Sequence, residues 1–235
     1  MDKPQERKKQ RWWWNWRVKI LVGLLPFHLL YSFYCQHFLP PTTLTQIGAV
    51  LSDRVTFRRY YVSREKISRN LYLAVIAEED TNFLQHGGFE WDSMRQALLK
   101  GRGSGSTISQ QTAKNTFAWQ HQDYVRKALE MYSTVLIEKT WGKQRIMEVY
   151  VNVIEFEEGV YGAEAVAQEF FHKPASQLTR REAATIAACV PQPKGCLRHR
   201  TNSPVMRKVQ AHVLKEMTYI GNQKGVRDFL EQMSK

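Results

Sequence analysis

Cysteine is scarce in this chain of 235 residues, which has only Cys35, Cys189 and Cys196. Three cysteines are too few for a disulfide framework. No Cys-x-x-Cys or His-x-x-x-His spacing occurs, so the sequence does not predict structural zinc. Cys189 lies in an alanine-rich stretch and is predicted to be a small buried hydrophobic residue. The alternative, in an oxidising compartment, is a Cys189–Cys196 disulfide.

Acidic residues are also few, with 22 Asp and Glu against 34 Lys and Arg, which gives a formal net charge of +12. This excess indicates an anionic partner, such as a phospholipid surface, a nucleic acid or a phosphorylated substrate. Hydrophobic residues make up 43% of the chain, which excludes a disordered protein and allows one good core.

Only one long hydrophobic run is present, residues 20–39, and it ends at Pro40-Pro41. Twenty residues suffice to cross a hydrocarbon core of about 30 Å. The preceding residues 1–19 are basic and rich in tryptophan, which predicts a cytoplasmic tail followed by a single transmembrane helix. An amphipathic helix and a cleaved signal peptide are the alternatives, and the lack of a small-x-small site before Pro40 disfavours cleavage.

Residues 40–235 are predicted to form one mainly α-helical domain. No period-two alternation and no internal repeat follows residue 63, whereas apolar residues recur at helical spacing. Asp123, Thr179 and Ser203 are predicted helix N-caps, the second of them in a capping box with Glu182. Residues 55–62 are expected to be a short strand or an extended arm, with a plain linker as the alternative.

The acidic cluster Glu78-Glu79-Asp80 follows an apolar helical run. Glu79 is expected at the C-terminal end of that helix, where the helix dipole disfavours a carboxylate, and partial burial would add to this. Both effects raise a pKa, which suits a general base working near neutral pH. A solvated acidic helix end is the alternative.

A glycine-rich loop, residues 101–105, opens a polar helix but lacks the Gly-Lys-Ser/Thr of a P-loop. Gln110, Gln111 and Lys114 share a helical face, with Ser106 and Thr107 at its start, so the sequence predicts an anion site. An ordinary flexible loop or lid is the alternative. Further along the chain lie Arg126, Lys127 and Glu130. They are either a structural ion-pair cluster or a second carboxylate held by anion-binding cations.

Several separated motifs match one family. They are Glu79-Asp80-x-x-Phe83-x-x-His86-x-Gly88, Gly105-Ser106-Thr107-Ile108-x-Gln110-Gln111-x-x-Lys114-Asn115, Arg126-Lys127-x-x-Glu130, Lys143-x-x-Ile146-x-Glu148-x-Tyr150-x-Asn152 and Arg181-Glu182-Ala183-Ala184. On these motifs the chain resembles the monofunctional biosynthetic peptidoglycan transglycosylases of glycosyltransferase family 51. The resemblance covers roughly residues 40–193 and includes the membrane anchor.

The resemblance implies a lysozyme-like, two-lobed helical fold that polymerises lipid II into peptidoglycan strands. Glu79 would deprotonate the acceptor 4-hydroxyl, which attacks C1 of the growing glycan with inversion and expels undecaprenyl diphosphate. The diphosphate-sugar region would be bound by Ser106, Thr107, Gln110, Gln111, Lys114, Asn115, Arg126 and Lys127. Glu130 would be a second catalytic carboxylate, acting directly or through a divalent metal (Mg²⁺ or Mn²⁺).

The resemblance further implies a single-pass protein of the inner membrane, with its catalytic domain on the periplasmic or extracellular side. Other cell-wall synthesis or division proteins would be its partners. Nucleic acid, an organic cofactor and a transpeptidase domain are not expected.

The chain departs from the family pattern at four places. Glu90 stands where Asp is usual, Val151 where Leu is common, Gln122 where Arg is frequent, and Glu157-Glu158 where Gly-Pro is usual. Loss of the arginine would weaken diphosphate binding, whereas the two acids reshape a turn whose role the sequence does not define.

Two rival functions remain. A lysozyme-like hydrolase or lytic transglycosylase would also use a catalytic Glu, but it needs neither the Ser-Thr-x-x-Gln-Gln-x-x-Lys-Asn face nor an anchor. A membrane-tethered basic module that binds nucleic acid or acidic lipid would depend on charge and not on particular carboxylates.

Overall fold

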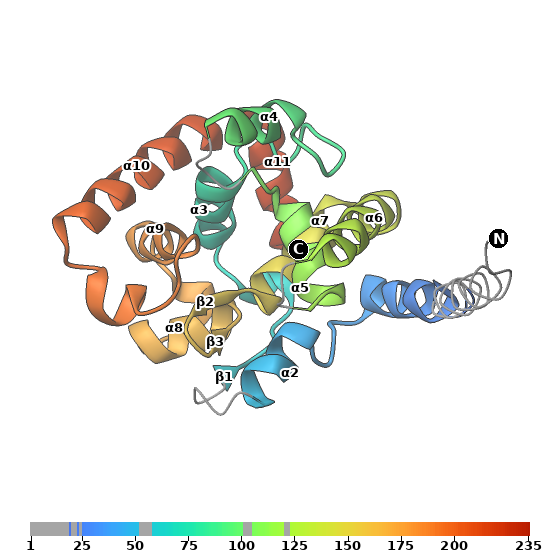
Figure 1. Cartoon of the computed structure of the whole chain (residues 1–235). Helices are drawn as coiled ribbons and strands as arrows, with labels where there is room; N and C mark the ends of the chain where they lie inside the picture. The colour runs from blue at the N-terminus through green and yellow to red at the C-terminus, as the bar shows by residue number, and fades with distance from the viewer. Residues whose placement is uncertain (1–18, 20–22, 24, 52–57, 101–104, 120–122) are drawn as a thin grey trace, which may run out of the picture. The chain divides into compact units, whose positions relative to one another are not determined.

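The computed structural model describes residues 19, 23, 25–51, 58–100, 105–119 and 123–235, which fall into two units, Met1–Leu39 and Pro40–Lys235 (Figure 1). In the first unit residues 25–37 are helical, and large apolar side chains such as Phe27, Leu30 and Phe33 are exposed. None of the helices in the described ranges has the length and apolar character needed to cross a membrane. The predicted basic tail lies almost entirely outside the described residues.

The second unit is mainly helical, which confirms the predicted class. Its α-helices are α2 (Leu44–Leu51), α3 (Arg69–Glu79), α4 (Trp91–Lys100), α5 (Ile108–Phe117), α6 (Tyr124–Thr140), α7 (Gly142–Val153), α8 (Ala163–Phe171), α9 (Arg180–Cys189), α10 (Pro204–Gly221) and α11 (Lys224–Met233). Short helical turns cover Arg64–Lys66, Ala175–Gln177 and Cys196–Arg200, and the strands are β1 (Arg58–Arg59), β2 (Glu155–Glu157) and β3 (Val160–Tyr161).

Helix α3 is the central element of one helix group. Residues 71–77 are all buried, because α3 packs against α9, α10 and α11. A helix that is apolar on every side belongs in a core. The helix starts at Arg69 behind the N-cap Ser68, whose side chain accepts a hydrogen bond from the backbone N–H of Asn70.

A second helix group consists of α5, α6 and α7, which pack on one another. Figure 1 shows this group beside α3, and α11 contacts both α3 and α7. The predicted caps are confirmed: Asp123 accepts from the backbone N–H of Arg126, Ser203 from that of Met206, and Thr179 forms the capping box with Glu182.

A small sheet with the strand order β1-β3-β2 joins a strand near the start of the second unit to two strands from its middle. β1 pairs parallel with β3, and β2 pairs antiparallel with β3. β1 confirms the strand alternative for part of residues 55–62, and β2 and β3 are two short strands after residue 63 that the sequence pattern did not reveal. Strands of two or three residues are too short to show a period-two pattern.

Cys189 and Cys196 form a disulfide, so the interpretation of Cys189 as a simple buried hydrophobic residue is wrong. Cys189 ends α9, and the chain returns through Pro191, Pro193 and Gly195. Gly195 adopts the left-handed conformation with φ of +65°, which glycine accepts without strain. The tertiary turn, which the sequence did not reveal, brings the two sulfurs together.

Candidate active site

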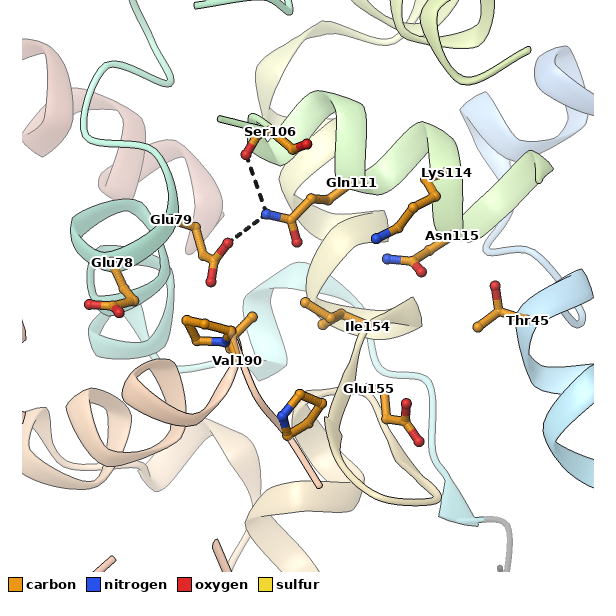
Figure 2. Close-up of a pocket in the computed structure, with 12 residues that line it drawn as sticks. Thr45, Glu78, Glu79, Ser106, Gln111, Lys114, Asn115, Ile154, Glu155 and Val190 are labelled. Atoms are coloured by element: carbon orange, nitrogen blue, oxygen red, sulfur yellow. Dashed lines mark hydrogen bonds between the residues drawn. The ribbon is translucent and has the colours of Figure 1, made fainter. Parts of the chain in front are cut away.

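Three adjoining cavities lie between α3, α5 and the β2 region of the second unit. The largest has a volume of about 450 Å³, and Figure 2 shows its lining. Glu78 and Glu79 come from the end of α3, and Gln111, Lys114 and Asn115 from α5. The remaining lining residues are Thr45, Ser106, Ile154, Glu155, Val190, Pro191 and Pro193. Shared lining residues connect this cavity to two smaller ones of about 190 and 200 Å³.

Glu79 is the last residue of α3 and is largely buried. Burial raises the pKa of its carboxyl group, while the hydrogen bond from Gln111 and the charge of Lys114 oppose that rise. Its Oε1 atom is buried and has no hydrogen-bond partner in the described part of the chain. Glu79 therefore combines the raised pKa that the sequence predicted with an unbonded oxygen beside a cavity, and both features suit a general base.

A short hydrogen-bond chain orients Glu79. Nε2 of Gln111 donates to Oε2 of Glu79 over 2.5 Å, as Figure 2 shows, and to the Ser106 carbonyl over 3.5 Å. The hydroxyl of Tyr150 donates to Oε1 of the same Gln111 amide over 3.3 Å. Tyr150 is fully buried, which raises its pKa well above the ordinary value, so its hydroxyl stays a proton donor. These hydrogen bonds fix which end of the Gln111 amide group faces Glu79.

Glu78 is a site residue that the sequence analysis left without a role. It lines the two cavities that Glu79 also lines. Burial, followed by the neighbouring charge of Glu79, raises its pKa to about 7. Glu155 also lines the largest cavity, and burial raises its pKa as well. Two adjacent acidic residues at a helix end gave a signal for Glu78, whereas nothing in the sequence singled out Glu155.

Positive charge gathers in the adjoining 200 Å³ cavity, which is lined by Thr45, Ser106, Lys114, Asn115, Trp119, Arg126, Lys127 and Glu130. Lys114 also lines the largest cavity, so it faces both spaces. Desolvation lowers its pKa, and Glu130 is the main group that opposes this effect. Lys114 donates to no group among the residues that the structure describes. Its ammonium group is therefore available to an anionic ligand.

Glu130 is only 3% exposed, and both of its carboxylate oxygens are occupied. Arg126 donates to Oε2 over 3.0 Å and Lys127 to Oε1 over 2.5 Å. The described residues contain no group of three His, Cys, Asp or Glu side chains that could hold a metal ion. In this arrangement Glu130 holds the side chains of Arg126 and Lys127 in place. It has no free carboxylate oxygen with which to bind a metal ion.

Thr107 and Gln110 have structural contacts. They form a reciprocal capping box at the start of α5, and the Thr107 hydroxyl donates to the Gly88 carbonyl over 2.7 Å. Gln110 is fully buried and lies outside the lining of all three cavities, so the predicted shared face of Gln110, Gln111 and Lys114 is wrong. Asp80 accepts from the Ile108 N–H over 3.0 Å and from His86, which joins the first two motifs.

The four departures lie in different surroundings. Glu90 accepts hydrogen bonds from Asn82 and Ser93 and lines the 190 Å³ cavity. Val151 is buried in the core. Glu157 is fully buried and binds backbone N–H groups near residue 195. Gln122 and most of the glycine-rich loop, residues 101–104, lie outside the described residues.

The helical fold, the buried Glu79 and the cationic α5–α6 face fit the class of the transglycosylases. The family model described as Transglycosylase matches residues 46–218, and the chain belongs to this family.

Relatives named biosynthetic peptidoglycan transglycosylase match most of the chain. The protein of Pasteurella multocida (strain Pm70) is 44% identical over 212 residues, which cover 86% of this chain and 85% of the relative. That of Haemophilus influenzae (strain Rd) is 38% identical over 226 residues, which cover 90% and 91%. That of Escherichia coli O1:K1 is 48% identical over 172 residues, which cover 69% of each chain.

Proposed function

We propose that this chain polymerises lipid II into linear glycan strands of peptidoglycan. Family membership and the names of its relatives make it a glycosyltransferase of cell wall biosynthesis. The observation that carries the finer proposal is the position of Glu79. Its buried carboxylate, with one unbonded oxygen, lines the same cavity as Lys114, and Arg126 and Lys127 line the adjoining cavity.

In the proposed reaction Glu79 accepts the proton of the 4-hydroxyl of the acceptor sugar. That oxygen forms a bond to C1 of the growing glycan, while the bond between C1 and the diphosphate oxygen breaks. The diphosphate leaves with the electron pair, and the configuration changes from α to β. Because the leaving group gains negative charge, fixed cations lower the barrier, and this is the role we assign to Lys114, Arg126 and Lys127.

The other predicted residues support these groups. Gln111 orients Glu79, Ser106 and Asn115 line the cavities on either side of Lys114, and Glu130 holds Arg126 and Lys127 toward the diphosphate. Thr107 and Gln110 do not contact the substrate in this proposal. They cap the start of α5, the helix that carries Gln111 and Lys114. The helix groups of α3 and of α5–α7 would be the two lobes of a lysozyme-like domain spanning residues 40–235, with the cavities between them.

We also propose a single-pass location in the inner membrane, with residues 40–235 outside the cytoplasm. The basic residues 1–19 precede a segment whose apolar side chains, including Phe27 and Phe33, are exposed. The Cys189–Cys196 disulfide supports the outward side, because disulfides persist in oxidising compartments. Lipid II, the growing strand and other cell-wall synthesis proteins would meet the enzyme there.

A divalent cation remains a prediction of the family resemblance. Both oxygens of Glu130 accept from cations, so Mg²⁺ or Mn²⁺ would bind mainly through the substrate diphosphate. Titrating Mg²⁺ into chelator-treated enzyme tests this. A Mg²⁺ requirement whose half-maximal concentration rises in Glu130→Gln would instead support direct ligation by Glu130.

The proposed function is tested with labelled lipid II in detergent, comparing the wild type with Glu79→Gln. We expect a polymer ladder from the wild type and none from the variant. Release of soluble fragments from purified, lipid-free peptidoglycan, with no ladder from lipid II, would overturn the proposal in favour of a hydrolase or lytic transglycosylase. A nucleic-acid or lipid-binding module would form no ladder, release no fragments and lose its ligand in moderate salt.

A further inference from the structure

One wall of the largest cavity is a segment that no family motif includes. Val190, Pro191 and Pro193 line this cavity together with Glu79 and Ile154. Figure 2 shows Val190 on the side of the cavity opposite the α5 residues Lys114 and Asn115. The cavity therefore has a polar side on α5 and an apolar side on residues 190–193. A sugar ring, with hydroxyl groups at its edge and an apolar face, matches both sides.

The wall segment is closed on itself by two sets of contacts. The Cys189–Cys196 disulfide joins its two ends. The Arg200 guanidinium donates to the carbonyls of Gln192, over 2.6 Å, and of Lys194, over 3.4 Å. These contacts fix the shape of the loop and tie it to Cys189, the last residue of α9.

Glu157 supplies a second attachment, to β2. It belongs to β2 and is 0% exposed. Its carboxylate accepts hydrogen bonds from the backbone N–H groups of Gly195 over 2.5 Å, Leu197 over 2.7 Å and Arg198 over 3.4 Å. No lysine, arginine or histidine forms an ion pair with Glu157 among the described residues. Its buried carboxylate is held by the N–H of Gly195, at the end of the wall segment, and by two N–H groups of the helical turn Cys196–Arg200 that follows it.

The same strand carries a cavity residue. Glu155, two positions before Glu157 on β2, lines the cavity, and Ile154 lies directly before it. Glu157 thus ties the wall segment to the strand that forms the adjacent part of the cavity. This gives a role to the Glu157-Glu158 pair, at which the sequence departs from the usual Gly-Pro of the family.

We propose that Glu157 and the Cys189–Cys196 disulfide form a clamp that holds residues 190–195 as the cavity wall and thereby sets the affinity for the sugar of the substrate. Glu157 is a positioning residue in this proposal, because it touches the wall segment and not the cavity. The inference rests on the proposed function of the cavity. Loosening the clamp reduces the fraction of molecules with a formed wall, so it raises KM and leaves the chemistry at Glu79 unchanged.

The experiment compares oxidised wild type, reduced wild type, Glu157→Gln, Glu157→Asp and the double variant Cys189→Ser/Cys196→Ser. Dithiothreitol supplies the two electrons and two protons that convert the disulfide into two thiols, and is itself oxidised to a cyclic disulfide. The first readout is the split between KM and kcat for lipid II, with the pH profile of kcat. The second, independent of activity, is the rate of tryptic cleavage after the exposed Lys194, measured by mass spectrometry.

We expect reduction, the double variant and Glu157→Gln each to raise KM about tenfold, as for a wall formed about a tenth of the time. The pH profile of kcat should not move, and cleavage after Lys194 should accelerate while cleavage after Lys215 in α10 does not. Glu157→Asp should recover part of the affinity, because it keeps the charge. Dithiothreitol should not affect the double variant, which separates the disulfide from Cys35.

Faster cleavage after Lys194 with an unchanged KM would overturn the positioning role, and an unchanged cleavage rate would overturn the clamp itself. A wild type that forms no polymer refutes the proposed function. The cleavage rates then still decide whether the clamp exists, so the two failures are distinguishable.

Discussion

The Gln111 side chain donates a hydrogen bond from Nε2 to Oε2 of Glu79 over 2.5 Å. This contact joins two residues that lie 32 positions apart in the sequence, and Oε1 of Glu79 has no partner among the described residues. A hydrogen bond to the charged form of a carboxylate stabilises that form. Gln111 therefore limits the rise in the pKa of Glu79 that burial causes, and directs its unbonded oxygen.

Glu79→Gln should lower the polymerisation rate by about 10²- to 10⁴-fold, the range of a lost general base. The variant should also show that the fold survives. Burial raises the pKa of Glu79 in the folded protein above its ordinary value of 4.5. Between the ordinary and the raised pKa the folded state binds more protons than the unfolded state, so the stability of the wild type falls as the pH rises through that range.

Glutamine removes that penalty, so Glu79→Gln should unfold at a higher temperature than the wild type at pH 8 and at a similar one at pH 4. Thermal unfolding at both pH values checks this. A variant that is inactive and also less stable at pH 8 would contradict the assignment.

Glu78→Gln should shift the acidic limb of the pH profile of kcat/KM to lower pH. Glu78 has a pKa of about 7, and the charges of Glu78 and Glu79 repel each other. Removing one carboxylate makes ionisation of the other easier, so Glu79 would become a base at a lower pH. The measurement is kcat/KM from pH 5 to 9. Superimposable profiles would show that the two groups titrate independently.

Tyr150→Phe should reduce kcat by about three- to tenfold, which corresponds to one hydrogen bond of about 1 kcal/mol. Without the hydroxyl donor, Oε1 of Gln111 loses the contact that keeps Nε2 directed toward Glu79. Gln111→Glu is a useful comparison, because it places a negative charge beside Glu79. We expect it to move the acidic limb to higher pH, whereas Tyr150→Phe should change the rate more than the pH profile.

Lys114→Met should lower kcat/KM by about 10²- to 10³-fold, the effect of removing one electrostatic donor. Lys127→Met is the matched control and should lower it less, because Lys127 is bound to Glu130 whereas Lys114 donates to no described group. Desolvation lowers the pKa of Lys114, so its charge costs stability in the folded protein. Thermal unfolding at pH 7 should therefore show Lys114→Met to be at least as stable as the wild type. Equal activity losses would remove the special role of Lys114.

Gln110→Ala should reduce the free energy of unfolding by about 1–2 kcal/mol, through loss of the capping box and of a buried side chain. Its KM should equal that of the wild type, because Gln110 is fully buried and lines none of the three cavities. Urea unfolding and steady-state kinetics give the two values. A raised KM with unchanged stability would restore Gln110 as a substrate-binding residue.

Local chemistry in the sequence determined the helices and their ends. Asp123, Thr179 and Ser203 cap helices because a side-chain oxygen satisfies a free N–H within the same turn, which needs no distant contact. The position of Glu79 at the end of α3 could also be predicted from local sequence, because the apolar helical run ends at the acidic cluster Glu78-Glu79-Asp80. The short strands and the disulfide could not, since they depend on segments that meet only in the folded chain.

Tertiary structure decided what each residue of the site does. Gln110 and Gln111 are chemically identical neighbours, and the sequence assigned both to substrate. One helical step of about 100° turns Gln110 into the core as a cap and Gln111 toward Glu79. In the same way Glu157, which the sequence placed only in a reshaped turn of undefined role, is buried and binds the segment that follows the cavity wall. The sequence supplies the functional groups, and the packing of α3, α5 and β2 selects which of them face the cavity.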